Sequence, residues 1–383
     1  MKTRGKVLLA MSGGVDSSVA AALLQEQGYE VVGAFMRLGS PGETLDELVP
    51  DNPKCEAPKL HKQGCCSVGD AADARLVSAQ LDIPLYVLNF RKDFRRVIDY
   101  FVDEYARGRT PNPCVRCNDW LKFGKLHEHA RQIGADYVAS GHYARIAERE
   151  DGPALLTGRH AEKDQSYVLF GIPRDQLAST LLPIGEYETK EEVRELARKF
   201  GLPVFNKPDS QEICFVPDND YASFVERERP ELASARGEIR DTSGQPLGEH
   251  EGQHRFTIGQ RRKIGVALGH PIYVVDKDPV TNTVTIGEEA DLLSAWCGVQ
   301  DANWLVEVEP GAWHACLARC RYNGELARAE FRREPDAEST FEVRFETPQR
   351  AVTPGQALVV HDPADPDRVL GGGWIARARQ EAL

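Results

Sequence analysis

A cluster of small and polar residues near the start of the chain has the composition of a phosphate-binding turn. Ser12-Gly13-Gly14-Val15-Asp16-Ser17 follows a short apolar run and precedes a segment with helical spacing. Glycines lack a Cβ, so the backbone can curl and bring its N–H groups close to an anion. The start of the helix adds unsatisfied donors and a positive dipole end. The turn lacks the lysine of a P-loop and the glycine spacing of dinucleotide-binding folds.

The thiols form the second group of residues that could do chemistry. Cys114 and Cys117 form a C-x-x-C pair, and Cys214 follows about a hundred residues later. A lone C-x-x-C pair is compatible with structural zinc, with a redox pair or with cluster ligation. Because prolines stand at positions 111 and 113, we expect the segment 110–118 to be extended and not helical. Two thiols brought together from distant loops near a phosphate site indicate sulfur chemistry.

The elements that position these residues alternate between strand and helix over the first two hundred residues. Apolar runs predict strands at 7–11, 29–36, 85–90 and 135–139, and helical spacing predicts helices at 18–27, 71–81, 94–108 and 120–133. Such alternation predicts an α/β fold with an open, doubly wound parallel sheet. Ligands of these sheets lie beyond the carboxyl ends of the strands, where Met36 and the Ser140-Gly141-His142 segment follow the runs.

The pattern changes after a predicted helix at 186–200. We expect a catalytic domain at 1–208, a small mixed domain at 209–289 and an antiparallel β-barrel domain at 290–383. Short alternating runs at 315–322, 327–332, 340–345 and 357–360 support the barrel.

Composition limits the class of protein. The 383 residues carry a net charge of −12, which disfavours nucleic-acid binding by bulk attraction but allows a local basic face. Candidates for that face are the basic residues at 91–96, 107–109 and 261–263. The apolar runs are too short to span a membrane, and the first strand starts too early for a signal peptide. With nine cysteines expected to be reduced, these features predict a cytoplasmic location.

Several motifs occur in an order that is specific to one family. They are Ser12–Ser17, Gly108–Asn118 with its Gly-Arg-Thr-Pro-Asn-Pro start, Ser140–Tyr143, Lys163–Tyr167, Asp209–Phe215, Gly252–His254 and Thr257–Arg261. The first resembles the pyrophosphate loop of N-type ATP pyrophosphatases, which split ATP into AMP and pyrophosphate. Together, the motifs resemble the bacterial tRNA-specific 2-thiouridylases over nearly the whole chain.

The resemblance implies a role for each matching residue. Cys117 would be the nucleophile and Cys214 would carry a persulfide. ATP would be held by Ala10, Met11, Ser12, Gly13, Gly14, Val15, Asp16, Ser17, Met36 and Gly141. The target base would meet Asn112, Pro113 and Cys114, and other parts of the tRNA would meet His142, Lys163, Asp164, Gln165, Arg321, Tyr322 and Gln356.

The chemistry of the residues agrees with this assignment. A uridine C2 oxygen leaves readily only after adenylation, which a pyrophosphate loop with Mg²⁺ on Asp16 would favour. A persulfide on Cys214 could then attack C2, and Cys117 could release the sulfur by forming a disulfide with Cys214. Exposing C2 requires the base to be flipped out of its stack. The persulfide implies a sulfur donor, either a cysteine desulfurase or a relay protein.

Alternatives to this reaction follow from the same residues. In some family members a carboxylate stands at the position of Cys114, so only one thiol is present in this segment. This chain has three thiols, Cys114, Cys117 and Cys214, which could instead ligate a 4Fe–4S cluster with one open iron. Another ATP pyrophosphatase, such as an amidotransferase synthetase or a tRNA lysidine synthetase, would need the loop but not the thiols. A sulfur carrier or nucleic-acid-binding module without catalysis would need no intact loop. Cys65 and Cys66 are expected to be either a packing feature or neighbours of the ATP site, and not catalytic.

Overall fold

The computed structural model describes residues 3–39, 68–209, 213–216, 218–233 and 236–379. Its first part is a parallel sheet with the strand order β3-β2-β1-β4-β7. The strands are β1 (Lys6–Ala10), β2 (Glu30–Arg37), β3 (Leu85–Asn89), β4 (Tyr137–Ser140) and β7 (Thr180–Leu181). The predicted α/β class and parallel sheet are therefore confirmed.

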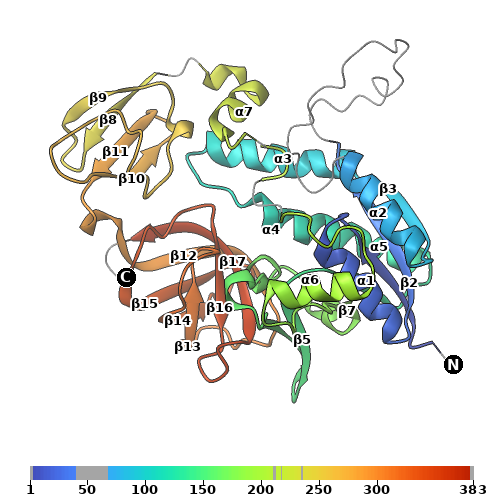
Figure 1. Cartoon of the computed structure of the whole chain (residues 1–383). Helices are drawn as coiled ribbons and strands as arrows, with labels where there is room; N and C mark the ends of the chain where they lie inside the picture. The colour runs from blue at the N-terminus through green and yellow to red at the C-terminus, as the bar shows by residue number, and fades with distance from the viewer. Residues whose placement is uncertain (1–2, 40–67, 210–212, 217, 234–235, 380–383) are drawn as a thin grey trace, which may run out of the picture.

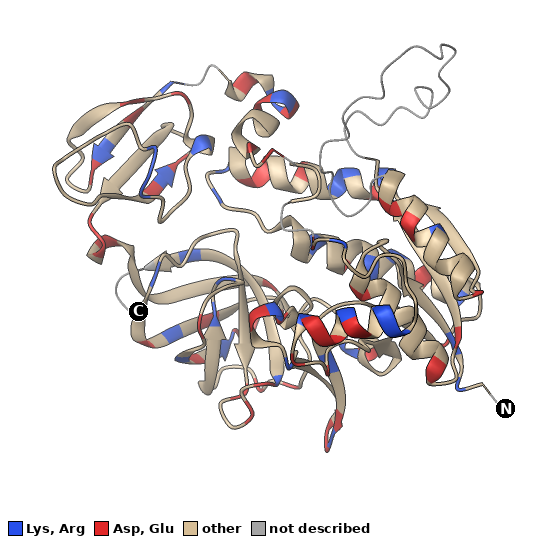
Figure 2. Ribbon diagram, viewed as in Figure 1, with Lys and Arg blue, Asp and Glu red and all other residues tan. Residues whose placement is uncertain are grey.

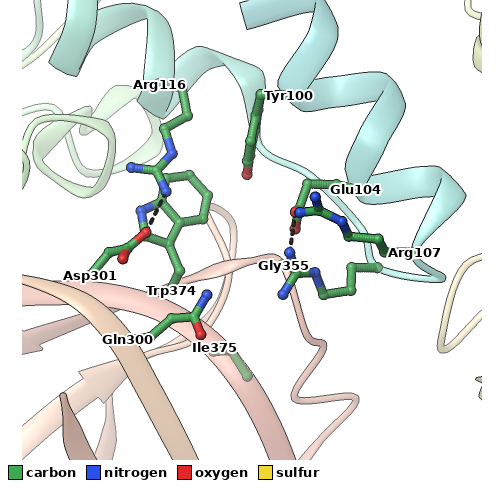
Figure 3. Close-up of a pocket in the computed structure, with 10 residues that line it drawn as sticks. Tyr100, Glu104, Arg107, Arg116, Gln300, Asp301, Gly355, Trp374 and Ile375 are labelled. Carbon is green, nitrogen blue, oxygen red and sulfur yellow. Dashed lines mark hydrogen bonds and ion pairs between the residues drawn. The ribbon is translucent and has the colours of Figure 1, made fainter. Parts of the chain in front are cut away.

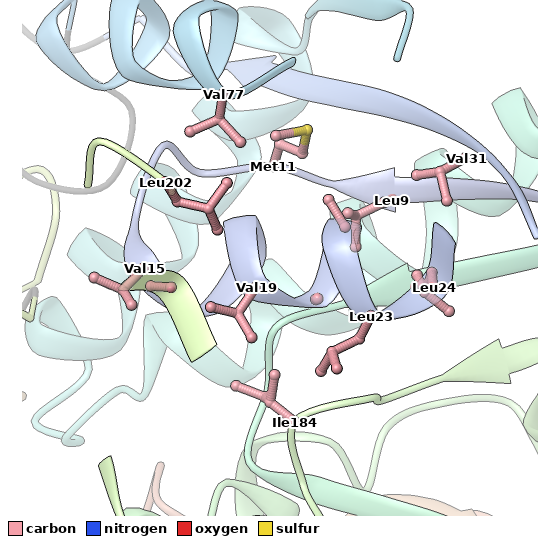
Figure 4. Packing of buried hydrophobic residues seen from close by; sticks show 14 of the residues in the cluster. Leu9, Met11, Val15, Val19, Leu23, Leu24, Val31, Val77, Ile184 and Leu202 are labelled. Atoms are coloured by element: carbon pink, nitrogen blue, oxygen red, sulfur yellow. The ribbon is translucent and has the colours of Figure 1, made fainter. Parts of the chain in front are cut away.

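Both faces of this sheet are covered by helices, which explains the continuous apolar runs of its central strands. The helices are α1 (Val15–Glu26), α2 (Val68–Gln80), α3 (Arg91–Ala106), α5 (Leu126–Gln132) and α6 (Lys190–Lys199). On one face Leu9 of β1 packs with Val19 of α1 and Val77 of α2 (Figure 4). On the other face Leu8 packs with Leu126 of α5. Strand β1 is thus buried on both sides directly before the predicted phosphate-binding turn at residues 12–17, called the nucleotide loop below.

The segment with the C-x-x-C pair differs from its prediction. Residues 113–117 are not extended but form helix α4 (Pro113–Cys117), which continues as a π-helix, η2 (Asn118–Lys125), into α5. Pro113 is compatible with this helix because the first helical residue needs no N–H partner. The side chain of Asn112 caps the helix by accepting a hydrogen bond from Val115 N at 3.4 Å. The extended prediction was therefore wrong from residue 113 onward.

The middle of the chain is a mixed four-stranded sheet with the order β10-β11-β8-β9 (Figure 1). Strands β8 and β11 are parallel and the other pairs are antiparallel. Its strands are β8 (Gly237–Asp241), β9 (Pro246–His250), β10 (Tyr273–Asp278) and β11 (Thr283–Gly287). Before it, helix α7 (Tyr221–Glu228) packs on α3, with Phe224 against Phe101.

The last part is a closed barrel with the order β12-β15-β14-β13-β16-β17, and every neighbouring pair is antiparallel. This confirms the predicted C-terminal β-barrel. Phe331, Phe341 and Val343 fill its interior. The strands are β12 (Leu293–Trp304), β13 (His314–Arg319), β14 (Ala327–Arg333), β15 (Phe341–Arg350), β16 (Ala357–His361) and β17 (Val369–Arg379).

Shorter elements lie between the larger ones along the chain. They are the hairpin β5 (Ala144–Arg149) and β6 (Gly152–Thr157) and the 3₁₀ turns Ala161–Lys163, Ser166–Val168, Arg174–Ser179, Pro230–Leu232, Gln253–Arg255 and Ala290–Leu292. Among the described residues, every helix is too short or too polar to cross a membrane.

Candidate active site

The nucleotide loop connects β1 to α1 and is shaped by its glycines. Gly13 has a φ of +72°, and a Cβ there would lie 2.1 Å from the carbonyl oxygen of Asp70. Gly14 is the N-cap of α1 and has no side chain to occupy the first N–H groups of the helix. Ser17 Oγ donates a hydrogen bond to Gly14 O at 3.2 Å and accepts one from Ser12 N at 3.2 Å. The loop therefore holds its curvature by itself and leaves a helix N-terminus facing the space where an anion would bind.

Gly141, at the end of β4, lies against the same loop. A Cβ on Gly141 would come within 2.6 Å of Ser17 N and 2.7 Å of the carbonyl carbon of Asp16. Only glycine permits this approach of β4 to the first turn of α1. The structure thus brings Gly141 to the predicted ATP-binding residues 10–17, while Met36 is buried at the end of the neighbouring strand β2.

Asp16 is the centre of an ionic network. Its two carboxylate oxygens accept from Lys190 Nζ at 2.7 and 2.8 Å, and one also accepts from the hydroxyl of Tyr143 at 2.9 Å. Lys190 also contacts Asp209 at 2.7 Å, and Asp209 pairs with Lys163 at 2.9 Å. Partial burial raises the pKa of Asp209, but the two lysines outweigh burial and hold that pKa below its usual value.

The thiols lie around one apolar cluster. Cys117 and Cys214 are both half-buried and pack against the cluster that contains Phe94, Phe101 and Phe215, while Cys114 is exposed. The expectation that both thiols lie on loops was wrong for Cys117, which is the last residue of α4. In the described part of the chain, no three side chains of Cys, His, Asp or Glu are arranged to hold a metal, so the geometry does not support the cluster alternative. Cys65 and Cys66 lie outside the described residues.

His142 is an internal residue of the site. It is 7% exposed, and its ring lies between Ser140 Oγ at 2.7 Å and Lys122 Nζ at 3.2 Å. Burial, aided by the charge of Lys122, lowers the pKa of His142 well below its usual value. Because an ammonium group can only donate, Nε2 of the neutral ring accepts from Lys122 and Nδ1–H donates to Ser140. The predicted tRNA contact of His142 would therefore require this pair to separate.

The predicted tRNA-binding residues at 163–165 also make internal contacts. Asp164 is buried, accepts from the N–H groups of Gly158 and Ser166 at 3.0 Å each, and pairs with Arg319 of the barrel at 2.9 Å. Gln165 Oε1 accepts from Tyr143 N at 2.9 Å. This segment therefore joins the barrel to the nucleotide site.

The barrel also holds the segment that precedes α4. Gln356 Nε2 donates to the carbonyl oxygens of Thr110 and Pro111 at 2.9 and 3.3 Å, and Thr110 N donates to Pro354 O at 2.9 Å. Gln356 thus supports the backbone next to Asn112. Arg321 is exposed and donates to Arg350 O at 2.8 Å. Tyr322 is half-buried, with its ring 6.0 Å from that of Tyr167.

A cavity of about 190 Å³ opens between α3, the 107–116 segment and the barrel (Figure 3). Arg116, which stands between the two thiols of α4, pairs with Asp301 at 2.9 Å and lies 4.1 Å over the ring of Trp374. Arg109 pairs with Glu104 on the opposite side. The cavity therefore places cationic and aromatic groups beside the end of the predicted base-contacting segment.

Basic and acidic residues alternate along helix α6 (Figure 2). In the predicted basic group at 91–96, Arg95 pairs with Asp99 and Glu228, and Arg96 stacks 3.9 Å from the ring of Trp120. Two residues beside the loop were missed from the sequence: Lys190, described above, and Lys207, whose Nζ donates to Gly13 O at 3.0 Å. No local motif identifies them, although a lysine in the first turn of a helix is an unusual choice.

Comparison with known proteins shows which family models match this chain. Three family models match in succession: a tRNA methyl transferase HUP domain at 5–218, a tRNA methyl transferase PRC-barrel domain at 223–288 and an aminomethyltransferase beta-barrel domain at 294–375. Among solved structures, a 4-thiouridine synthetase in complex with RNA and ATP aligns with a TM-score of 0.37 at 18% identity, over 59% of this chain and 51% of that chain.

Curated relatives match over almost their whole length, and all three described here are named tRNA-specific 2-thiouridylase MnmA. The Rhodopirellula baltica protein is 45% identical, covering 97% of this chain and 96% of the relative. The Carboxydothermus hydrogenoformans protein is 48% identical, with 98% of each chain covered. The Geobacter metallireducens protein is 47% identical, with 99% of each covered. This chain therefore belongs to the family of tRNA-specific 2-thiouridylases.

Proposed function

We propose that this chain is an ATP-dependent sulfurtransferase that thiolates C2 of the wobble uridine of tRNA and releases AMP and pyrophosphate. The observation that carries the proposal is the pairing of a preformed anion-binding loop with Cys117 and Cys214 around one apolar cluster. A tRNA lysidine synthetase or an amidotransferase synthetase would need the loop alone. The full-length relatives support the same reaction.

The first half-reaction is adenylation. The C2 oxygen of the flipped base attacks the α-phosphorus of ATP, and pyrophosphate leaves. The N–H groups at the start of α1, together with Ser12 and Ser17, are suited to stabilise the phosphate charge, and residues 10–17, Met36 and Gly141 form the nucleotide site. A Mg²⁺ ion, held by Asp16 once Lys190 releases it, would neutralise charge on the phosphates.

The second half-reaction transfers sulfur. The terminal sulfur of a persulfide on Cys214 attacks C2, and AMP leaves with the former C2 oxygen. The thiolate of Cys117 then attacks Sγ of Cys214, which forms the Cys117–Cys214 disulfide and leaves the sulfur on C2 as the thiocarbonyl. Two electrons pass from the cysteines to the transferred sulfur, so the cysteines end as a disulfide and the sulfur as the thiocarbonyl. An external thiol reduces the disulfide before the next cycle.

The parts of the chain share this work. A catalytic domain at 1–208 would do the chemistry, and domains at 209–289 and 290–383 would bind the tRNA. Asn112, Pro113 and Cys114 would meet the target base; His142, the 163–165 segment, Arg321, Tyr322 and Gln356 would contact or support other parts of the tRNA. A cysteine desulfurase or relay protein would supply the persulfide in the cytoplasm.

The test is anaerobic thiolation of unmodified tRNA with ATP and a desulfurase-generated persulfide, with iron determined on the same sample. We expect iron-free protein to form 2-thiouridine, and Cys117→Ser and Cys214→Ser to abolish it. Cys297→Ala removes a thiol buried in the barrel and should retain activity. Full thiolation by either serine variant, or thiolation only with stoichiometric iron, would overturn the persulfide route. Pyrophosphate release without thiouridine would point to another ATP pyrophosphatase.

A further inference from the structure

Lys190 occupies a position that is unfavourable for a lysine on its own. It is the first residue of α6, after the capping residue Thr189, and is 8% exposed. A cation at a helix N-terminus opposes the helix dipole, and burial of an ammonium group costs solvation. Two carboxylates, Asp16 and Asp209, compensate by contacting Nζ at 2.7 Å each. The placement of Lys190 is therefore explained by the two groups that it joins.

The two carboxylates belong to different parts of the site. Asp16 lies in the first turn of α1, at the nucleotide loop. Asp209 stands five residues before Cys214 in the sequence. Lys190 is thus the direct bridge between the nucleotide loop and the segment that leads to the persulfide thiol.

A second lysine fixes the same segment to the same loop. Lys207 Nζ donates to Gly13 O at 3.0 Å and pairs with Asp70 and Asp73 of α2 at 2.6 and 2.5 Å. Residues 207–209 are therefore attached to the loop at two points, once through a backbone carbonyl and once through Lys190. An anion that enters the loop would attract both lysines, whereas a divalent cation would compete with Lys190 for Asp16.

We infer that Lys190 is a positioning residue that couples nucleotide binding at the loop to the placement of the Cys214 segment. The inference rests on the proposed function, since only then do loop and thiol serve one reaction. Phosphates at the loop would compete with Asp209 for Lys190, and Asp16, where it holds Mg²⁺, would release Lys190. Either event would change how Asp209 is held, so the Cys214 segment would respond to nucleotide binding.

The experiment measures the alkylation rate of Cys214 by iodoacetamide, read by mass spectrometry of its peptide. The full-length protein is compared with and without saturating α,β-methylene ATP and Mg²⁺, with nucleotide binding verified by calorimetry. We expect the nucleotide to change the wild-type rate by at least about fivefold, the lower end of coupling between linked sites. In Lys190→Met, the rates with and without nucleotide should coincide, and Lys190→Arg should restore part of the response.

Two further variants separate this role from a general loss of structure. Lys163→Met removes the other cation from Asp209 and keeps the bridge to Asp16, so its nucleotide response should persist. Asp209→Asn breaks the bridge from the opposite side, and it decides the question if Lys190→Met fails to fold or to bind nucleotide. An unchanged response in Lys190→Met overturns the inference, as does an unchanged response in Asp209→Asn where Lys190→Met fails to fold or to bind nucleotide, or the absence of a response in the wild type. Because the assay contains neither tRNA nor sulfur donor, failure to thiolate tRNA would not affect it.

Discussion

The close approach of Gly141 to α1 makes Gly141→Ala the sharpest test of the nucleotide site. The added Cβ would lie 2.6 Å from Ser17 N, 2.7 Å from the carbonyl carbon of Asp16 and 2.9 Å from Ser17 Cα. All three atoms are backbone, so no side-chain rotation relieves the clash. Either β4 or the first turn of α1 must move.

The size of the effect follows from the cost of forcing a methyl group into packed structure, about 1–3 kcal/mol. If this cost falls on the first turn of α1, whose N–H groups are proposed to bind the phosphates, the Kd for ATP should rise by about 5- to 150-fold. Calorimetric titration with a non-hydrolysable ATP analogue measures this change. Thermal unfolding of the same samples shows whether the fold is retained.

Gly134→Ala is the matched control. Gly134 has a φ of +64° and no atom within 4 Å of an added Cβ, so alanine there pays only for the left-handed backbone, about 1–2 kcal/mol. This control should lose stability and keep its nucleotide affinity. A wild-type Kd and melting temperature for Gly141→Ala would refute the argument that glycine is needed for this contact.

Three other changes test the supports of the site. Burial raises the pKa of Asp119 to about 7, although the charge of Arg116 acts to lower that pKa. Folding therefore favours the protonated carboxyl group, and this contribution to stability is lost as the pH rises from the ordinary pKa of 3.8 through about 7. Relative to wild type, Asp119→Asn should therefore gain up to about 4 kcal/mol in the free energy of unfolding between about pH 4 and about pH 8, measured by denaturant titration; parallel pH profiles would contradict this. Asp164→Ala leaves Arg319 and two backbone N–H groups without their acceptor and should cost about 3–5 kcal/mol of unfolding free energy, whereas an unchanged denaturation midpoint would show that the contact is dispensable. Gln356→Ala should slow tRNA thiolation by about fivefold, corresponding to about 1 kcal/mol, with the ATP Kd unchanged; a wild-type rate would exclude a supporting role for Gln356.

The sequence predicted best where the signal was local. The apolar run of β1, the glycine turn and the start of α1 are contiguous, so they indicated the nucleotide loop directly. Position 113 shows the limit of local rules, because proline opposes a helix interior but suits a first helical turn. The π-helix after Cys117 had no recognisable pattern. Strand β17 carries three consecutive glycines at 371–373, and pairing across the barrel compensates for their weak strand preference.

The candidate site shows the same division. Family motifs predicted the thiols and the loop as site residues, but they did not predict the internal contacts of His142 and Asp164. His142 contacts Lys122, which lies twenty residues earlier in the sequence, and Asp164 pairs with Arg319 of the barrel. Lys190 was missed for the same reason: the two carboxylates that it joins are 193 residues apart, from Asp16 to Asp209. Such non-local pairing is set by packing and cannot be read from spacing.

The π-helix at 118–125 limits how this chain can change in length. A π-helix closes its hydrogen bonds over one residue more than an α-helix, so deleting one residue there would favour ordinary α-helical winding. Each α-helical residue turns the chain by about 100°, but seven residues wound as an α-helix turn the chain by nearly as much as eight wound as a π-helix. Deleting one residue from 118–125 should therefore leave Cys117 against the apolar cluster that it shares with Cys214 and preserve sulfur transfer. Deleting two residues exceeds what this change of winding can absorb, so α4 should rotate by about 100° relative to α5, Cys117 should leave the cluster, and sulfur transfer should be lost even if every motif residue is kept.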